Sequence, residues 1–265
     1  RVVPRVLQSM PVDDQIHLRA RAILHGILYH VGEDEWFDEC QNSSGSSLGV
    51  PYWDTSQERK FTFPMTATEN AKRLFERYRL YNSNLYREVE EFNDQAPIGG
   101  IYDVVESSRA TTVDKTTDKR RFICIEPTCN MFLQQGLMRI LYARMSEVGL
   151  DVETLPNRHR QLAMISSITR ENATIDWSSA SDTVSIEILR WLLPPSWFSL
   201  VNLLRCSSTV IDGKVVSLHM ISSMGNAVTF PLETLVFWTY AQAVNHTLRG
   251  DSLSHYPNPN KCSEC

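Results

Sequence analysis

A pair of aspartates stands in the segment TIDWSSASD, which covers residues 174–182. The β-favouring Thr174 and Ile175 precede Asp176, and apolar residues at helical spacing follow Asp182. The segment therefore predicts a strand that ends at a carboxylate, a turn and then a helix. A carboxylate in that place can bind Mg²⁺ that is coordinated to a phosphorylated substrate. The alternative is that Asp176 is a turn residue and Asp182 a helix N-cap, because aspartate is common in both positions.

A basic segment lies earlier in the chain. Between Arg109 and Arg121 it holds five basic and two acidic residues in thirteen positions, a net charge of +3 in a chain whose overall charge is −5. The alternating strand Phe122–Ile125 follows and would hold these cations in place. Arginine and lysine on a supported loop are suited to phosphate recognition. The alternative is a solvated run of charge without a ligand. The acidic overall charge argues against indiscriminate coating of nucleic acid, but it allows one local basic channel.

A third group is the turn Ser-Ser-Met-Gly-Asn at residues 222–226, which leads into the last predicted helix. Gly225 would let the backbone approach a ligand closely, because glycine has no side chain. Templated nucleotide transfer needs a carboxylate for Mg²⁺, cations for a triphosphate, and a small-residue loop against the ribose and the template. The three groups supply these kinds of parts.

The elements that must position these groups can be read in order from the N-terminus. Periodicity in the first half predicts a helix within residues 1–31 that begins near Asp13, followed by a turn-rich loop with a short strand over 32–64. A capping box at Thr66 and Glu69 predicts the start of a helix that extends to about Phe92. Loops and strands are predicted over 97–127.

The second half of the chain is predicted to carry the aspartate pair and the small-residue turn. Its patterns indicate a long helix after Pro127, a polar connection over 151–172, a helix ended by Pro194 and Pro195, an Asp-Gly hairpin at 211–214, and a final helix opened by Gly225.

Composition limits the class of protein. The chain has 265 residues, of which 42% are hydrophobic and 22% charged, which is typical of a soluble globular protein. No apolar run approaches the roughly 20 residues that cross a bilayer. The first residue is Arg1 and no signal pattern follows it. We therefore expect that the initiator end is missing or that the chain is a piece of something longer.

Four long stretches closely resemble the replicase subunit, an RNA-dependent RNA polymerase, of the positive-strand RNA phages called leviviruses. They are GVPYWDTSQERKFTFP (49–64), SSRATTVDKTTDKRRFICIEPTCNMFLQQGLMRIL (107–141), TIDWSSASD (174–182) and ISSMGNAVTFPLETLVFW (221–238). The resemblance covers nearly the whole chain and is far longer than a short motif. It implies templated transfer of a ribonucleoside monophosphate from a nucleoside triphosphate to the 3′-hydroxyl of RNA.

The resemblance also implies an α+β fold of the right-hand polymerase type. Residues 1–165 would be mostly helical fingers, with the nucleotide-entry segment at 109–127. Residues 166–265 would form a partial palm with a small antiparallel sheet and a finger-like hairpin insertion at 208–222. The thumb would be absent.

The same resemblance implies roles for individual residues. Asp176 would be the catalytic metal ligand, for Mg²⁺ or Mn²⁺, and Asp182 would sense the incoming ribose. The cations that would bind the incoming nucleotide are Lys115, Lys119 and Arg121. The residues that would face the ribose and the template are Ser223, Gly225, Asn226 and Thr229.

One feature departs from the family pattern, because no Tyr/Phe-Gly-Asp-Asp hairpin follows the last predicted helix. We therefore expect a chain truncated before that motif and inactive by itself. The alternative is a non-catalytic RNA-binding fragment. A reverse transcriptase would share the palm but usually places a bulky side chain where a ribose 2′-hydroxyl would lie. Asp182 and Asn226 can both hydrogen-bond a hydroxyl and favour ribonucleotides. A purely structural helical protein would explain the helices alone.

The resemblance implies partners and a location as well. The expected partners are the RNA template and product, nucleoside triphosphates, host elongation factors Tu and Ts, and a small-subunit ribosomal protein. The expected location is the cytoplasm of the bacterial host, without a membrane.

Overall fold

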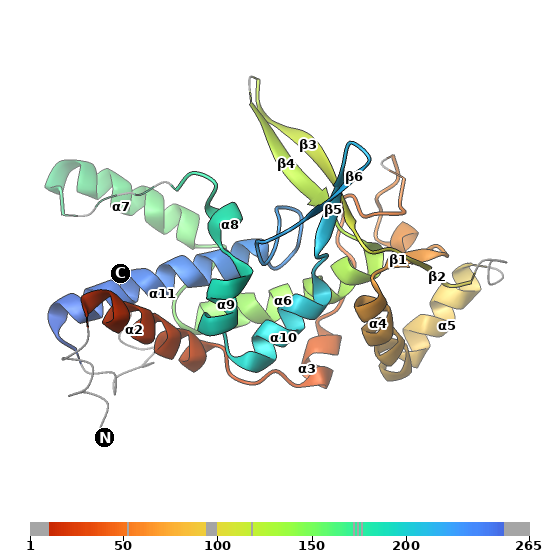
Figure 1. Ribbon diagram of the computed structural model, residues 1–265, viewed down its shortest axis with the longest axis horizontal. Helices are drawn as coiled ribbons and strands as arrows, with labels where there is room; N and C mark the ends of the chain where they lie inside the picture. The colour runs from red at the N-terminus through yellow and green to blue at the C-terminus, as the bar shows by residue number, and fades with distance from the viewer. Residues whose placement is uncertain are drawn as a thin grey trace.

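A computed structural model describes residues 11–51, 53–93, 100–117, 119–171, 173, 175 and 177–251. Helices form most of the body, and a long hairpin made of β3 and β4 projects from it (Figure 1). The elements in the first half are α2 (Val12–Ile27), α3 (Glu33–Asp38), η1 (Glu58–Phe61), β1 (Met65–Ala67), α4 (Glu69–Tyr81), α5 (Ser83–Phe92), β2 (Tyr102–Val104), β3 (Ser108–Thr116) and β4 (Lys119–Ile125). Those in the second half are α6 (Thr128–Glu147), α7 (Leu155–Thr169), α8 (Ala180–Thr183), α9 (Ile186–Leu192), α10 (Pro195–Leu204), β5 (Ser208–Ile211), β6 (Lys214–Ser217) and α11 (Thr229–Arg249).

Helix α6 forms the centre of the core. It packs against α3, α4, α10, α11 and β1, and its side chains are buried around most of its circumference. A helix enclosed in this way carries apolar residues on every side rather than in one stripe. The long helix predicted after Pro127 is therefore confirmed. The buried apolar cluster runs without a break from Ala20 of α2 to Ala243 of α11, so one core joins elements from both sides of residue 165.

The main sheet has four strands in the order β4-β3-β5-β6. The pairs β3–β4 and β5–β6 are antiparallel, whereas β3 and β5 are parallel, with Ser108 opposite Thr209. A second, two-stranded sheet pairs β1 and β2 in parallel. Within residues 166–265 the described strands β5 and β6 pair antiparallel, as expected there, but β5 also pairs in parallel with β3 from the first half of the chain, which the sequence did not predict. Parallel partners that lie far apart in sequence leave no turn signal between them, so local patterns could not reveal the pairing.

The Asp-Gly hairpin that the sequence predicts at residues 211–214 is confirmed. Asp212 and Gly213 have positive φ angles of 48° and 76°, as a type I′ turn requires at both central positions. Because β5 pairs with β3, this hairpin extends the sheet that begins with the basic segment. The basic segment and the 208–217 hairpin are therefore parts of one sheet.

The helix predicted from Thr66 to about Phe92 is two helices instead. Thr66 lies in β1, and the N-cap is Thr68, whose hydroxyl accepts from the Ala71 N–H. Asn82 then ends α4 and caps α5 with its side chain. Asparagine competes for backbone groups and so interrupts an otherwise continuous helical pattern.

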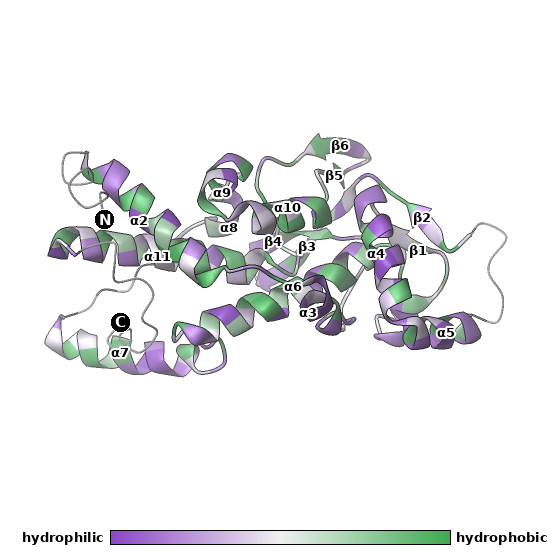
Figure 2. Cartoon of the chain, turned by 90° about the horizontal axis from the view of Figure 1, so that it is seen from below, coloured by the Kyte–Doolittle hydropathy of each residue, from purple (hydrophilic) through white to green (hydrophobic). Residues whose placement is uncertain are grey.

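Three further predictions along the chain need correction. Among its described residues, segment 32–64 carries the helices α3 and η1 and no strand, and the predicted polar connection over 151–172 contains the helix α7. Figure 2 shows polar and apolar residues interspersed along α7, and this mixture hides the helical period. Pro195 begins α10 instead of only ending the preceding helix, because proline is well tolerated in the first turn.

Candidate functional site

The basic segment forms the projecting hairpin of β3 and β4 (Figure 1). Lys115, Lys119 and Arg121 are exposed there and form no ion pair with any residue that the structure describes. Lys119 and Arg121 lie two positions apart on β4 and therefore point to the same face of the hairpin. The Arg120 Nε instead lies 3.4 Å from a carboxylate oxygen of Asp114 across the hairpin. This ion pair is exposed and contributes little to stability. The predicted nucleotide-binding cations are thus accessible and available to phosphate groups.

The inner end of this hairpin is joined to the small-residue turn by backbone contacts. The Cys124 N–H donates to the carbonyl oxygen of Met224 at 2.7 Å. Gly225 has a φ of 109°, and a Cβ at this position would lie 2.1 Å from the Cys124 carbonyl oxygen. Only glycine fits such a contact. The sequence predicts a close approach of Gly225 to a ligand, whereas the group that excludes a side chain here is strand β4 itself.

The turn at residues 221–228 is held by the side chains that the sequence assigns to template and ribose. The Asn226 carboxamide oxygen accepts from the Val228 N–H at 3.0 Å, and the Thr229 hydroxyl donates to the Ser223 carbonyl oxygen at 2.7 Å. All three of Ser223, Asn226 and Thr229 are buried. The Ser223 hydroxyl has no hydrogen-bond partner among the described residues. In this conformation these groups stabilise the turn.

Gln134 of α6 connects the turn to the rest of the core. Its side chain is fully buried, and its carboxamide oxygen accepts from the Ala227 N–H at 3.3 Å. Its amide nitrogen donates to the Leu204 carbonyl oxygen at 2.9 Å and to the Glu126 carboxyl at 3.4 Å. One side chain therefore contacts the turn, the end of α10 and the residue that follows β4.

Glu126 is the buried carboxyl group at this junction. Burial raises its pKa to about 7, although hydrogen bonds from Cys206 and Gln134 and the positive charge of Arg205 act in the opposite direction. Arg205 itself is fixed by a hydrogen bond of 2.8 Å from its guanidinium to the Leu218 carbonyl oxygen. Sequence reasoning missed Glu126 and Gln134. The available signal was a pair of polar residues within the apolar pattern that runs from β4 into α6.

A second set of carboxylates lies where α8 meets α11. Asp182 is exposed on α8, and Glu233 is half-buried in the first turns of α11. Burial, and to a smaller extent the charge of Asp182, raise the pKa of Glu233. The sequence did not single out Glu233, because a glutamate near the start of a helix is ordinary. Asp182 lies within the short helix, not at its N-cap.

Asp176 lies outside the residues that the structure describes, and so do Thr174 and Asn172. Of its neighbours, Ile175 and Trp177 are not in a strand, so the predicted strand is not seen at those positions. The Trp177 ring stacks on Phe237 of α11, with centroids 5.2 Å apart and planes 21° from parallel. Trp177, which follows Asp176 in the sequence, therefore packs on α11 at Phe237, and Phe237 lies one helical turn after Glu233. Among the described residues, no group of three or more His, Cys, Asp or Glu side chains is arranged to hold a metal ion.

The sequence profile of the family described as RNA replicase, beta-chain, matches residues 7–256. The chain belongs to this family. Curated relatives include the RNA-directed RNA polymerase subunit beta of Enterobacteria phage SP, which is 32% identical over 89% of this chain. The corresponding subunit of Escherichia virus Qbeta is 40% identical over 57% of this chain. The RNA-directed RNA polymerase beta chain of Escherichia phage MS2 is 30% identical over 78% of it.

The chain spans 39%, 26% and 37% of the lengths of these three relatives, respectively. It therefore corresponds to well under half of each relative. In the part of the chain that the structure describes, no helix is long and apolar enough to cross a membrane.

Proposed function

We propose that this chain forms the nucleotide-entry and template-binding part of an RNA-directed RNA polymerase of an RNA phage. The reaction is templated transfer of a ribonucleoside monophosphate from a nucleoside triphosphate to the 3′-hydroxyl of RNA. The observation that carries the proposal is the backbone junction between Cys124 and Met224–Gly225, which joins an exposed basic hairpin to a turn built of small polar residues. In this proposal residues 1–165 are fingers, residues 166–265 are part of a palm, and 208–222 is an inserted hairpin.

Lys115, Lys119 and Arg121 bind the triphosphate of the incoming nucleotide. They are exposed and unpaired among the described residues, and the planar guanidinium of Arg121 can donate two parallel hydrogen bonds to phosphate oxygens. The junction at Cys124 holds the base of the hairpin at a constant position relative to the turn. The triphosphate is therefore positioned relative to the groups that contact the sugar.

Asp182, Ser223, Gly225, Asn226 and Thr229 contact the ribose and the template. Asp182 is already exposed, whereas the side chains of the turn are buried and bonded within it. Their contact with RNA therefore requires the turn to change conformation. The unpaired hydroxyl of Ser223 supports such a change, because a buried polar group without a partner costs about 1–3 kcal/mol that a new hydrogen bond would recover.

Asp176 is the proposed catalytic ligand of Mg²⁺ or Mn²⁺, on the strength of the family resemblance. The described carboxylates Asp182 and Glu233 do not make up a metal site without it, because Mg²⁺ needs several oxygen ligands to replace its water. We further propose that polymerisation needs carboxylates from outside this chain, and that the isolated chain behaves as an RNA-binding fragment.

The partners proposed for the complete polymerase are RNA, nucleoside triphosphates, host elongation factors Tu and Ts, and a small-subunit ribosomal protein. The proposed location is the host cytoplasm. The relatives are called beta chains or beta subunits, which supports an assembly of several polypeptides.

Primer extension tests the proposal in a polymerase that joins this chain to the C-terminal part of the Qbeta relative. The isolated chain should be silent, the joined polymerase should extend RNA, and Asp176→Asn should abolish extension. Arg121→Ala should raise the KM for nucleotides, lower kcat, or both. The fall in kcat/KM should correspond to roughly 2–4 kcal/mol, because a charged contact in a closed site is lost. Lys214→Ala, an exposed lysine on the adjacent hairpin, is the matched control and should change neither.

The alternative RNA-binding function gives a different result in the same series. In that case Arg121→Ala would weaken RNA binding by the isolated chain, and the nucleotide KM of the joined polymerase would not change. Synthesis by the isolated chain would contradict the proposed need for carboxylates from elsewhere.

A further inference from the structure

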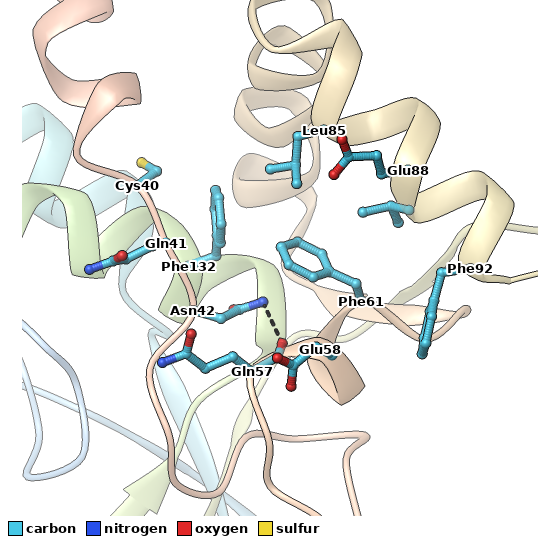
Figure 3. Close-up of a pocket in the computed structure, with 11 residues that line it drawn as sticks. Cys40, Gln41, Asn42, Gln57, Glu58, Phe61, Leu85, Glu88, Phe92 and Phe132 are labelled. Carbon is cyan, nitrogen blue, oxygen red and sulfur yellow. Dashed lines mark hydrogen bonds between the residues drawn. The ribbon is translucent and has the colours of Figure 1, made fainter.

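A pocket of about 400 Å³ opens beside α5 (Figure 3). It is lined by residues from the segment after α3, from η1, from α5 and from α6. None of its lining residues belongs to the basic hairpin, to the turn at 221–228 or to the carboxylates at α8 and α11. Its volume lies within the range of ligand-binding pockets. The pocket is therefore a separate feature that the proposed polymerase function does not use.

The walls of the pocket are mainly apolar. They are formed by Phe61, Leu85, Val89, Phe92 and Phe132. Phe61 packs edge-on against Phe132 with ring centroids 5.9 Å apart, an arrangement that fixes both rings. Phe92 is more than half exposed. Such walls favour a ligand whose apolar part is flat or branched.

Two carboxylates line the same pocket, Glu58 on η1 and Glu88 on α5, and Figure 3 shows Phe61 between them. Both are exposed, and neither forms an ion pair with a residue that the structure describes. Arg139 is not among the lining residues; with the Gln41 amide turned so that its oxygen faces the guanidinium, that oxygen accepts from the Arg139 Nε at 3.0 Å. The charged residues that line the pocket are Glu58 and Glu88, so the charge of the lining is negative, which disfavours phosphate and attracts a cation.

We propose that this pocket binds a basic side chain, together with an adjacent apolar side chain, from another polypeptide. The apolar walls would bury the neighbouring side chain and the stem of the arginine or lysine, as long basic side chains commonly do. Glu58 and Glu88 would pair with the cationic end. The occupant is assigned to a polypeptide because an apolar side chain next to an arginine or lysine supplies both the apolar body and the cation that this lining fits. Neither catalysis nor nucleotide binding by this chain is required.

Two dipeptides test this assignment on the folded 265-residue chain, with binding followed by NMR chemical-shift changes. Acetyl-Phe-Arg-amide carries the proposed cation, and acetyl-Phe-citrulline-amide has nearly the same shape without the charge. The arginine peptide should bind at least tenfold more tightly. The double variant Glu58→Gln/Glu88→Gln should remove most of that preference, whereas Glu153→Gln, at an exposed glutamate that does not line the pocket, should leave it unchanged.

Two further measurements use a variant whose pocket is filled by a larger side chain and a free amine as the ligand. Val89→Trp should abolish binding of both peptides, and the dispersion of the remaining amide signals will show whether that variant is folded. The proposal is overturned if neither peptide binds, if both bind equally, or if a folded Val89→Trp variant still binds. If 4-phenylbutylamine binds more tightly than the arginine peptide, the occupant is a free organic cation and the assignment to a polypeptide is wrong.

Discussion

The buried carboxyl group of Glu126 should make the stability of the protein depend on pH. In the unfolded chain the group ionises near its ordinary pKa of 4.5, whereas in the folded chain its pKa is about 7. The folded state therefore binds more protons than the unfolded state between these values, and its stability must fall as the pH rises through that window. At 1.36 kcal/mol per pKa unit, the difference amounts to about 3 kcal/mol by pH 8.

Urea unfolding at pH 5 and pH 8 measures this effect in the wild type and in Glu126→Gln. Glutamine has nearly the same shape and does not ionise, so the wild type should lose about 2.5 kcal/mol more than the variant between pH 5 and pH 8, because part of the effect is already present at pH 5. The comparison between variants cancels other titrating groups, including Glu233, whose pKa is also raised, and His25, whose pKa is lowered. Equal pH dependence in the two proteins would refute the reasoning that Glu126 is held neutral by burial.

Three further substitutions test the junction and the turn. Gly225→Ala should reduce the free energy of unfolding by more than 3 kcal/mol, whereas Gly149→Ala, at a positive φ of 80° with nothing within 4 Å of the added Cβ, should lose only about 1 kcal/mol in the same urea titration. Gln134→Leu should cost about 1–3 kcal/mol, because the Ala227 N–H loses its buried acceptor, whereas the Leu204 carbonyl keeps the Asn130 side-chain amide as a donor; an unchanged unfolding midpoint would contradict this. Asn226→Ala in the joined polymerase should reduce the preference for ribonucleotides over deoxynucleotides by about 1–3 kcal/mol, and undiminished discrimination in competition assays would place sugar recognition elsewhere.

Local sequence patterns predicted the elements whose causes are themselves local. The Asp-Gly turn at 212–213 demands two positive φ angles, and the apolar run after Pro127 continues as one long helix. The same patterns could not show that Asn82 divides a helix or that β3 pairs in parallel with β5. The parallel pairing depends on what packs against the segment, which a pattern of neighbours along the chain does not contain. The break at Asn82 has a local cause, the side chain that caps α5, but the apolar pattern continues across it and hides it.

The residues of the candidate site also fall into those that local sequence patterns indicate and those that they do not. Exposed cations such as Lys119 can be recognised from sequence, because their charge is unusual in an acidic chain. The sequence could indicate that the backbone at Gly225 lies close to another group. It could not indicate which group, because Cys124 is distant in sequence. Glu126 and Gln134 were missed altogether. Their importance arises from burial at a meeting point of several elements, and burial of a polar residue is a property of the fold.

The contrast between exposed and buried residues bears on how the proposed site would work. The cations at the end of the hairpin provide attraction, but an exposed hairpin alone would not hold them at a fixed distance from the sugar-binding groups. That distance is set where Cys124 meets Met224 and where Gln134 bonds to Ala227. Because these contacts are made by backbone groups and by one fully buried side chain, movement of the hairpin base would also disturb the turn. In the proposed function, positioning of the triphosphate and recognition of the ribose would therefore depend on the same buried junction.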